Sequence, residues 1–300
     1  MNTRIRVADI PGMLTAPVAS SIRDVLTSTP VHPATLDARP ALAGLGLPSL
    51  TFTITPRRVR GVPLSTRAGR YLLTVLGEPP SDTAPGSVSL IHMPDGMTLD
   101  EARVAARRSG DMPPDFYSRA IMPGGAEIGP KGVSISVIDL TPGEWIVAGY
   151  GMTTEPTTLT VTGAMPATLP EPRATAAFTV SEMRIQLSSG SLRRGRNLIR
   201  IENDGHEPHF ITIERVPAGT TEAHLEATML AVLGEDPRDE ALPEEAFQPI
   251  AVSTDQSAGT VMWLPVTLEA GTYAVTSWNP DPRSTTAGAR IEMYAVLTVS

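Results

Sequence analysis

The chain has 300 residues, enough for one to three domains, and 41% of them are hydrophobic, enough for a packed core. Cysteine is absent, which excludes disulfides, zinc–thiolate sites, cysteine nucleophiles and copper–thiolate centres. The net charge of −8 lies wholly in residues 175–300, which carry 9 basic and 17 acidic side chains. This acidity argues against a nucleic acid or an anionic membrane as partner.

Residues 1–45 are rich in proline and small residues and are predicted to form an N-terminal extension. They contain no basic segment followed by an apolar core, so no signal peptide is expected. No part of the chain approaches the ~18 consecutive apolar residues of a transmembrane helix. Apolar residues such as Leu14 and Leu26 predict that the extension packs along the next domain or onto a partner subunit. A proline-rich stretch, residues 165–174, is predicted to be a stiff linker.

Segments on the two sides of this linker match at nearly constant offsets. Phe52-Thr-Ile matches Phe178-Thr-Val, and Gly69-Arg-Tyr-Leu matches Gly195-Arg-Asn-Leu, both at an offset of 126. Further matches begin at residues 94 and 217, 140 and 268, and 159 and 297. Because such collinear matches are hard to obtain by chance, they predict two copies of one domain, residues 46–164 and residues 175–300.

Each copy is rich in short β-type segments. They alternate apolar and polar residues or are rich in β-branched residues, and we expect strands at residues 71–75, 88–92, 133–140, 145–148, 197–202, 210–214, 261–268 and 273–276. One helix is inserted in each copy: Thr98 and Glu101 form a capping box, and residues 221–233 are apolar at helical spacing. The fold class is therefore all-β, as two tandem β-sandwiches with one short inserted helix each.

At Asn203-Asp-Gly-His-Glu-Pro-His209-Phe the chain resembles the cupredoxin (plastocyanin-like) family. In that family an Asn-x-Gly-type turn precedes the first copper-ligand histidine, and a cysteine, a second histidine and a methionine follow on a late loop. The resemblance implies a Greek-key sandwich, and it covers residues 175–300 well and residues 46–164 through the repeat. It also favours an extracytoplasmic location, in the cell envelope or secreted.

Carried over position by position, the resemblance implies a degenerate copper site. His209 stands at the first histidine position, Ser277 replaces the cysteine, and Met293 falls near the axial methionine. Residues 283–290 contain no second histidine, and in the first copy Gly149 matches Ser277. A type 1 copper site needs a thiolate with two imidazoles, so no metal or other cofactor is expected. We expect His209 to be buried near residues 277–293 and hydrogen-bonded.

Other candidate residues have competing interpretations. His206 is three residues from His209, a poor chelating spacing on a strand, although a turn could bring the pair together with His224. The acidic residues between 235 and 245 lack the spacing of a calcium loop and are interpreted as solvated. Trp145, Trp263 and Tyr273 are predicted core residues. Trp278 is predicted either to anchor an interface or to cover the metal position.

An arginine cluster lies in the first copy, and residues 193–196 partly repeat it. It is either a partner-docking or anion-binding patch or a set of solvated positions, and it comprises Arg57, Arg58, Arg60, Arg67 and Arg70.

No nucleophile, metalloprotease or nucleotide-binding motif is present, so no catalytic residue is expected. The leading hypothesis is a non-catalytic binding or structural protein, part of a cell-envelope or secreted assembly, whose partner is another subunit or a second copy. The alternative is a copper-handling protein that uses His209, Met293 and His206. An enzyme with a site at the domain junction is a third hypothesis.

Overall fold

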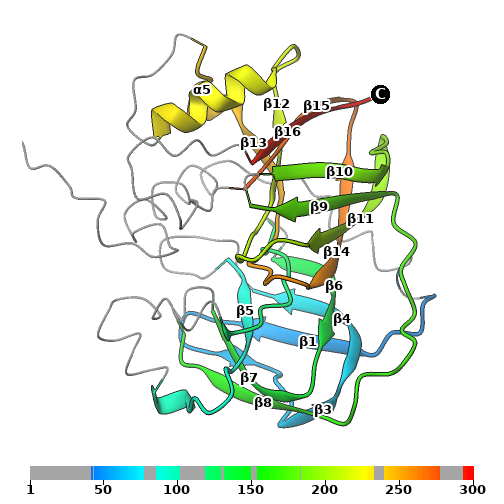
Figure 1. Cartoon of the computed structure of the whole chain (residues 1–300), viewed down its shortest axis with the longest axis vertical. Helices are drawn as coiled ribbons and strands as arrows, with labels where there is room; N and C mark the ends of the chain where they lie inside the picture. The colour runs from blue at the N-terminus through cyan, green and yellow to red at the C-terminus, as the bar shows by residue number, and fades with distance from the viewer. Residues whose placement is uncertain are drawn as a thin grey trace, which may run out of the picture.

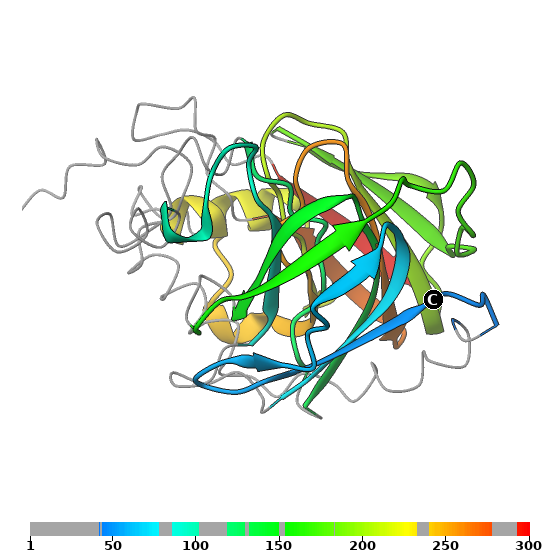
Figure 2. The ribbon, with the colours of Figure 1, turned by 90° about the horizontal axis from the view of Figure 1, so that it is seen from below.

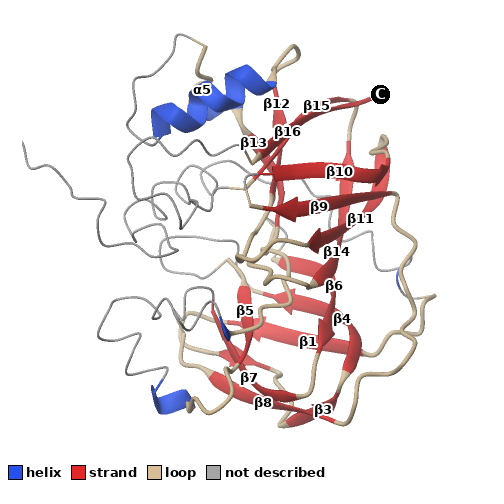
Figure 3. Cartoon of the chain, viewed as in Figure 1, coloured by secondary structure: helices blue, strands red, loops and turns tan. Residues whose placement is uncertain are grey.

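The computed structural model describes residues 42, 44–77, 86–101, 119–129, 132–149, 154–182, 184–232, 240–277 and 293–300. Strands dominate these residues, as Figure 3 shows, and the expected all-β class is confirmed. Within them, no helix is long and apolar enough to cross a membrane.

The first copy of the repeat forms two groups of hydrogen-bonded strands. One has the order β2-β1-β4-β6, and the other has the order β3-β8-β7-β5. The strands are β1 (Ser49–Ile54), β2 (Val59–Arg60), β3 (Ser65–Arg67), β4 (Gly69–Leu76), β5 (Val88–His92), β6 (Val133–Leu140), β7 (Gly143–Gly149) and β8 (Thr157–Thr162). Phe52 and Leu73 of the first group share a buried cluster with Leu90 and Val147 of the second, so the two sheets pack face to face.

The second copy repeats the first group and three strands of the second group, and the fourth strand of that second group pairs at the opposite edge. Its strands have the orders β10-β9-β11-β14 and β13-β12-β15-β16. The strands are β9 (Ala176–Ser181), β10 (Arg184–Gly190), β11 (Gly195–Asn203), β12 (Thr212–Val216), β13 (Gln248–Val252), β14 (Val261–Leu268), β15 (Gly271–Thr276) and β16 (Tyr294–Val299). Parallel pairing recurs at the same offset of 126, because Phe52 pairs with Val75 and Phe178 pairs with Ile201.

Side-chain interactions repeat as well. The indole of Trp145 donates a hydrogen bond to the carbonyl of Thr141, and the hydroxyl of Tyr273 donates to the carbonyl of Glu269, four residues back in both cases. The structure therefore supports the repeat at the level of packing, beyond the sequence matches.

In the first copy, Gly143 lies against the ring of His92, so closely that a Cβ would be 2.0 Å from Nε2, and Gly143 has a φ of +142°. The absence of a Cβ there admits the ring.

The two copies share one continuous sheet and one continuous core. β6 pairs antiparallel with β14 through Ile138 with Met262 and Val137 with Trp263, which produces an eight-stranded sheet. Figure 1 shows this sheet as a ladder running from β10 above to β1 below. A further contact comes from residues 120–127, which pair with residues 252–257 through bridges such as Pro123 with Gln256. The sequence matches did not predict this junction.

The outer face of the long sheet is buried around Trp263. The guanidinium of Arg70 lies 4.1 Å from the centre of its ring, and Arg70 also forms a two-pronged ion pair with Asp139. Arg70 donates to the carbonyl of Pro170, which holds the proline-rich segment against this face. Leu42 packs in the same cluster, so this part of the N-terminal extension is in contact with β6 and β14. Residues 1–41 and 43 of the extension lie outside the described residues.

The expected helical segments are observed where the structure describes them. Helix α5 (Glu222–Val232) occupies the position expected for residues 221–233, and the 3-10 helix η4 (Glu244–Ala246) follows. Figures 1 and 2 show α5 on the outside of the strand layers, where Leu225 packs against Val216 of β12. The capping box is confirmed, because the backbone N–H of Thr98 donates to Glu101 and that of Glu101 donates to Thr98 Oγ1.

Candidate functional site

The turn that precedes His209 is held together by the amide side chain of Asn203. Nδ2 of Asn203 donates to the carbonyls of Glu207 and Gln256, each at 2.7 Å, and Oδ1 accepts the N–H of Gly205 at 3.0 Å. His209 is then paired with Gln256 through two backbone hydrogen bonds of 3.0 and 2.8 Å. Since residues 252–257 also pair with the first copy, the turn is connected to the junction between the copies.

His209 is buried, as expected, with 5% of its surface exposed. The expected hydrogen bond to its ring is not found, because neither Nδ1 nor Nε2 has a hydrogen-bond partner within the part of the chain that the structure describes. Its neighbour is a carboxylate: Glu182 Oε1 lies 3.8 Å from Nε2, too far for a hydrogen bond. Asn203 and Gln256 bond to backbone atoms of the turn, and the imidazole has the Glu182 carboxylate as its polar neighbour.

Glu182 is the residue that the sequence analysis missed. It follows β9, and its Oε1 accepts the backbone N–H groups of His206 and of Glu207. Burial raises the pKa of Glu182, but these backbone N–H groups and the nearby His209 outweigh burial and lower it overall. Burial lowers the pKa of His209, and the Glu182 carboxylate opposes this lowering only in part. A neutral imidazole beside an ionised carboxylate results near neutral pH.

Ser277 follows β15, whose last residue, Thr276, pairs with Thr212 of β12. Ser277 is fully buried, and its Oγ has no hydrogen-bond partner among the described residues. Its backbone N–H donates to the carbonyl of Met293, which is also buried, so the expected proximity of Ser277 and Met293 is confirmed. Trp278 lies outside the described residues. Because Ser277 Oγ has no bond to a general base, the arrangement is not that of an activated nucleophile.

The residues present do not fit a type 1 copper ion. That ion needs a thiolate and two imidazoles, whereas this chain offers one imidazole, a neutral alcohol and a thioether at the matching positions. Within the residues that the structure describes, no group of three histidine, aspartate or glutamate side chains is arranged to hold a metal. His206 is exposed while His209 is buried, so the two rings do not converge.

The other histidine and the acidic candidates have separate positions. His224 lies at the start of α5, where Nδ1 is 2.7 Å from the hydroxyl of Thr221, so it is engaged in a cap. Of the acidic residues between 235 and 245, Glu240, Glu244 and Glu245 are described and exposed. Within the described residues, neither His224 nor these three glutamates forms a metal-holding group with His209.

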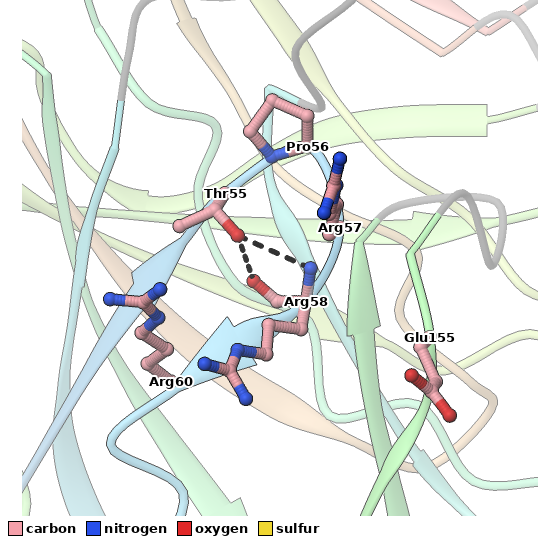
Figure 4. Close-up of a pocket in the computed structure, with 6 residues that line it drawn as sticks. All are labelled: Thr55, Pro56, Arg57, Arg58, Arg60 and Glu155. Carbon is pink, nitrogen blue, oxygen red and sulfur yellow. Dashed lines mark hydrogen bonds between the residues drawn. The ribbon is translucent and has the colours of Figure 1, made fainter.

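The arginine cluster divides in the structure. Arg70 is buried in its ion pair with Asp139, whereas Arg57, Arg58 and Arg60 are exposed. These three, with Thr55, Pro56 and Glu155, line an open pocket of about 500 Å³ between β1, β2 and the start of β8 (Figure 4). Arg67, on β3, is exposed as well but does not line this pocket, so the predicted cluster consists of one buried arginine and four exposed ones, three of them around the pocket.

No protein-family model and no curated protein matches the chain. Among solved structures it is similar to an auracyanin from Roseiflexus castenholzii, with 19% identity and a TM-score of 0.27, over 41% of this chain and 94% of that chain. Auracyanin A, a "blue" copper protein from Chloroflexus aurantiacus, has 15% identity and a TM-score of 0.25, over 41% and 99% of the two chains. Copper nitrite reductase from Nitrosomonas europaea has 14% identity and a TM-score of 0.23, over 84% and 93%. The description of the fold rests on the strand order and register of this structure.

Proposed function

We propose that this chain is a non-catalytic binding or structural protein, made of two tandem cupredoxin-like Greek-key sandwiches that hold no type 1 copper. The observation that carries the proposal is Ser277, a buried hydroxyl at the position of the family's thiolate ligand. An alcohol is a hard and neutral ligand near pH 7, and it does not supply the bond that defines the blue copper centre. The first copy has Gly149 at the equivalent position and no histidine ligand.

A scaffold role is also supported by the way the copies are joined. The shared eight-stranded sheet and shared core hold the two copies in one arrangement, which suits a protein that presents surfaces to a partner. We propose that this partner belongs to a cell-envelope or secreted assembly, a proposal that the family resemblance supports. We propose another subunit, or a second copy of this chain, as that partner.

A second candidate function is copper binding at His209. It is favoured by the two ring nitrogens of His209, which are buried without a hydrogen-bond partner, and by the buried thioether of Met293. A buried polar atom without a partner is a place where an ion or a water is expected. One imidazole and one thioether are few ligands, so this site would bind copper weakly and would not produce a thiolate absorption band.

Calorimetric titration with copper separates the two candidates. The scaffold proposal expects a dissociation constant weaker than 1 μM for Cu(I) and Cu(II), unchanged in His209→Ala. Sub-micromolar binding that is lost in His209→Ala, and kept in the control variant His206→Ala, contradicts the scaffold proposal. The exposed ring of His206 makes it the matched control.

A further inference from the structure

The turn between β1 and β2 is rigidly built. The backbone N–H and Oγ1 of Thr55 both donate to the carbonyl of Arg58, at 3.0 and 2.8 Å, and Oγ1 accepts the N–H of Arg58 at 3.2 Å (Figure 4). Arg57 is fixed to β8, because its carbonyl accepts the N–H of Glu155 at 2.9 Å. Arg60 is paired with Thr53 across the hairpin. The arginine side chains therefore project from a backbone that is already ordered.

These arginines carry positive charge that the described part of the chain does not neutralise. Arg57, Arg58 and Arg60 form no ion pair with described residues, and Glu155, which lines the same pocket, forms none with them within 4 Å. Figure 4 shows Arg58 and Arg60 extending to the same side of the turn. Fixed like charges on one turn repel each other, so an anionic partner is favoured there.

Matching negative charge lies on the second copy. Glu240, Glu244 and Glu245 precede β13, are exposed and form no ion pair with described residues. They belong to the part of the chain that carries the whole net charge of −8. In Figure 1 β1 lies in the lower half of the molecule, and α5 and β13 lie in the upper half. The two patches therefore do not meet within one molecule.

We propose that the arginine pocket of one molecule binds the acidic segment Glu240–Glu245 of a second copy, in a head-to-tail association. This inference rests on the proposed role as a binding or structural protein and names its partner. Because the two patches differ, the contact is heterologous, and repeating it builds a ring or an open chain of molecules. Exposed ion pairs are individually weak and are screened by salt, so the association is weak and depends on ionic strength.

Sedimentation equilibrium of the full chain tests this association. At 20 mM salt the weight-average mass is expected to rise above the 31.8 kDa of one chain as concentration increases, and to return to that value at 500 mM salt. The variants Arg58→Glu/Arg60→Glu and Glu244→Arg/Glu245→Arg should each weaken association at least about tenfold. The matched control Arg193→Glu/Arg194→Glu changes the charge equally on exposed arginines of the second copy and should associate like the parent.

An equimolar mixture of the two weakened variants should associate again, because each supplies the charge that the other lacks. This rescue also shows that both variants are folded. A chain that stays monomeric at 20 mM salt, a mixture that stays monomeric, or a control that weakens association as much as the test variants overturns the inference. None of these outcomes involves copper, so failure here is distinguishable from failure of the scaffold proposal, which the copper titration decides.

Discussion

Two equivalent hairpins of the repeat present opposite chemistry. In the first copy Ile54 pairs with Val59, and in the second copy Val180 pairs with Ile185, at the common offset of 126. The position of Pro56 in the first turn is that of Glu182 in the second. The turn of the first copy displays arginines around an open pocket. In the turn of the second copy, the carboxylate of Glu182 points inward and accepts backbone N–H groups near His209.

The comparison teaches that the duplicated part of this protein is its backbone and core. The strand order of the long sheet, its parallel register and the aromatic hydrogen bonds after β6 and β14 are common to both copies, whereas the smaller sheets differ in their fourth strand, which is β3 beside β8 in one and β13 beside β12 in the other. The polar groups at the turns are different in each copy, and those groups determine what each end of the molecule can bind. Four substitutions test how far this division holds.

The largest expected effect belongs to the shared core. Trp145 is fully buried, and replacing it by alanine should lower the free energy of unfolding by about 3–5 kcal/mol, measured by urea denaturation. Trp145→Tyr, which installs the residue type of the equivalent Tyr273, should cost clearly less. A loss below about 1 kcal/mol for Trp145→Ala would show that the packing of this indole contributes little to the stability of the first copy.

A buried acid distinguishes the second copy from the first. Glu214, on β12, is 1% exposed, and the equivalent residue of the first copy is Ile91. Burial raises the pKa of Glu214 to about 7, and a long hydrogen bond from Thr212 opposes this only weakly. Between pH 4.5 and 7 the folded state then holds a proton that the unfolded state has lost, so stability falls as the pH rises through this window.

Glu214→Gln should remove this pH dependence. Its stability advantage over the parent should be small at pH 4.5 and grow to about 3 kcal/mol at pH 8, measured by urea denaturation at a series of pH values. Glu240→Gln, at an exposed position, is the control and should follow the parent. An advantage that stays constant with pH contradicts a proton held on Glu214.

Asn203 tests the turn that precedes His209, and Gly77 occupies the equivalent position of the first copy. Asn203→Ala removes three hydrogen bonds and leaves buried carbonyl and N–H groups without partners, so a loss of about 1–3 kcal/mol is expected. Thermal unfolding measures it. The neighbouring Asp204 is exposed, and Asp204→Ala should change stability by no more than about 0.5 kcal/mol. If Asn203→Ala and Asp204→Ala lowered stability equally, the side-chain amide of Asn203 would not be what holds the turn.

His209→Leu should have the smallest effect. The ring makes no hydrogen bond through its nitrogens, so an apolar side chain of similar volume should change stability by less than about 1 kcal/mol. His209→Ala should cost more, because it leaves a cavity. Differential scanning calorimetry compares the two. A large loss for His209→Leu would mean that the ring nitrogens hold a ligand, in agreement with the copper candidate.

The eight strands that were expected from local alternation are observed, whereas the other described strands, β1, β2, β3, β8, β9, β10, β13 and β16, were not predicted from the sequence. The junction was not predicted, since nothing in β6 or β14 shows which strand edge each one meets. The burial of His209 was predicted correctly, but its hydrogen bond was not, because the nearest carboxylate oxygen, Glu182 Oε1, lies 3.8 Å from Nε2, beyond hydrogen-bond distance. Glu214 alternates like a solvent-facing residue, and only the packing of α5 over that face of the sheet explains its burial.

The pairing of β6 with β14 has a consequence for each copy taken alone. These strands occupy equivalent positions and run in opposite directions, which is the relation that a two-fold axis imposes between identical subunits. At this pair of strands the two copies therefore meet as two identical subunits related by a two-fold axis would. A single copy, cut free at the proline-rich segment, would expose Met262 and Trp263 along an open strand edge, and that edge would recruit another copy or aggregate.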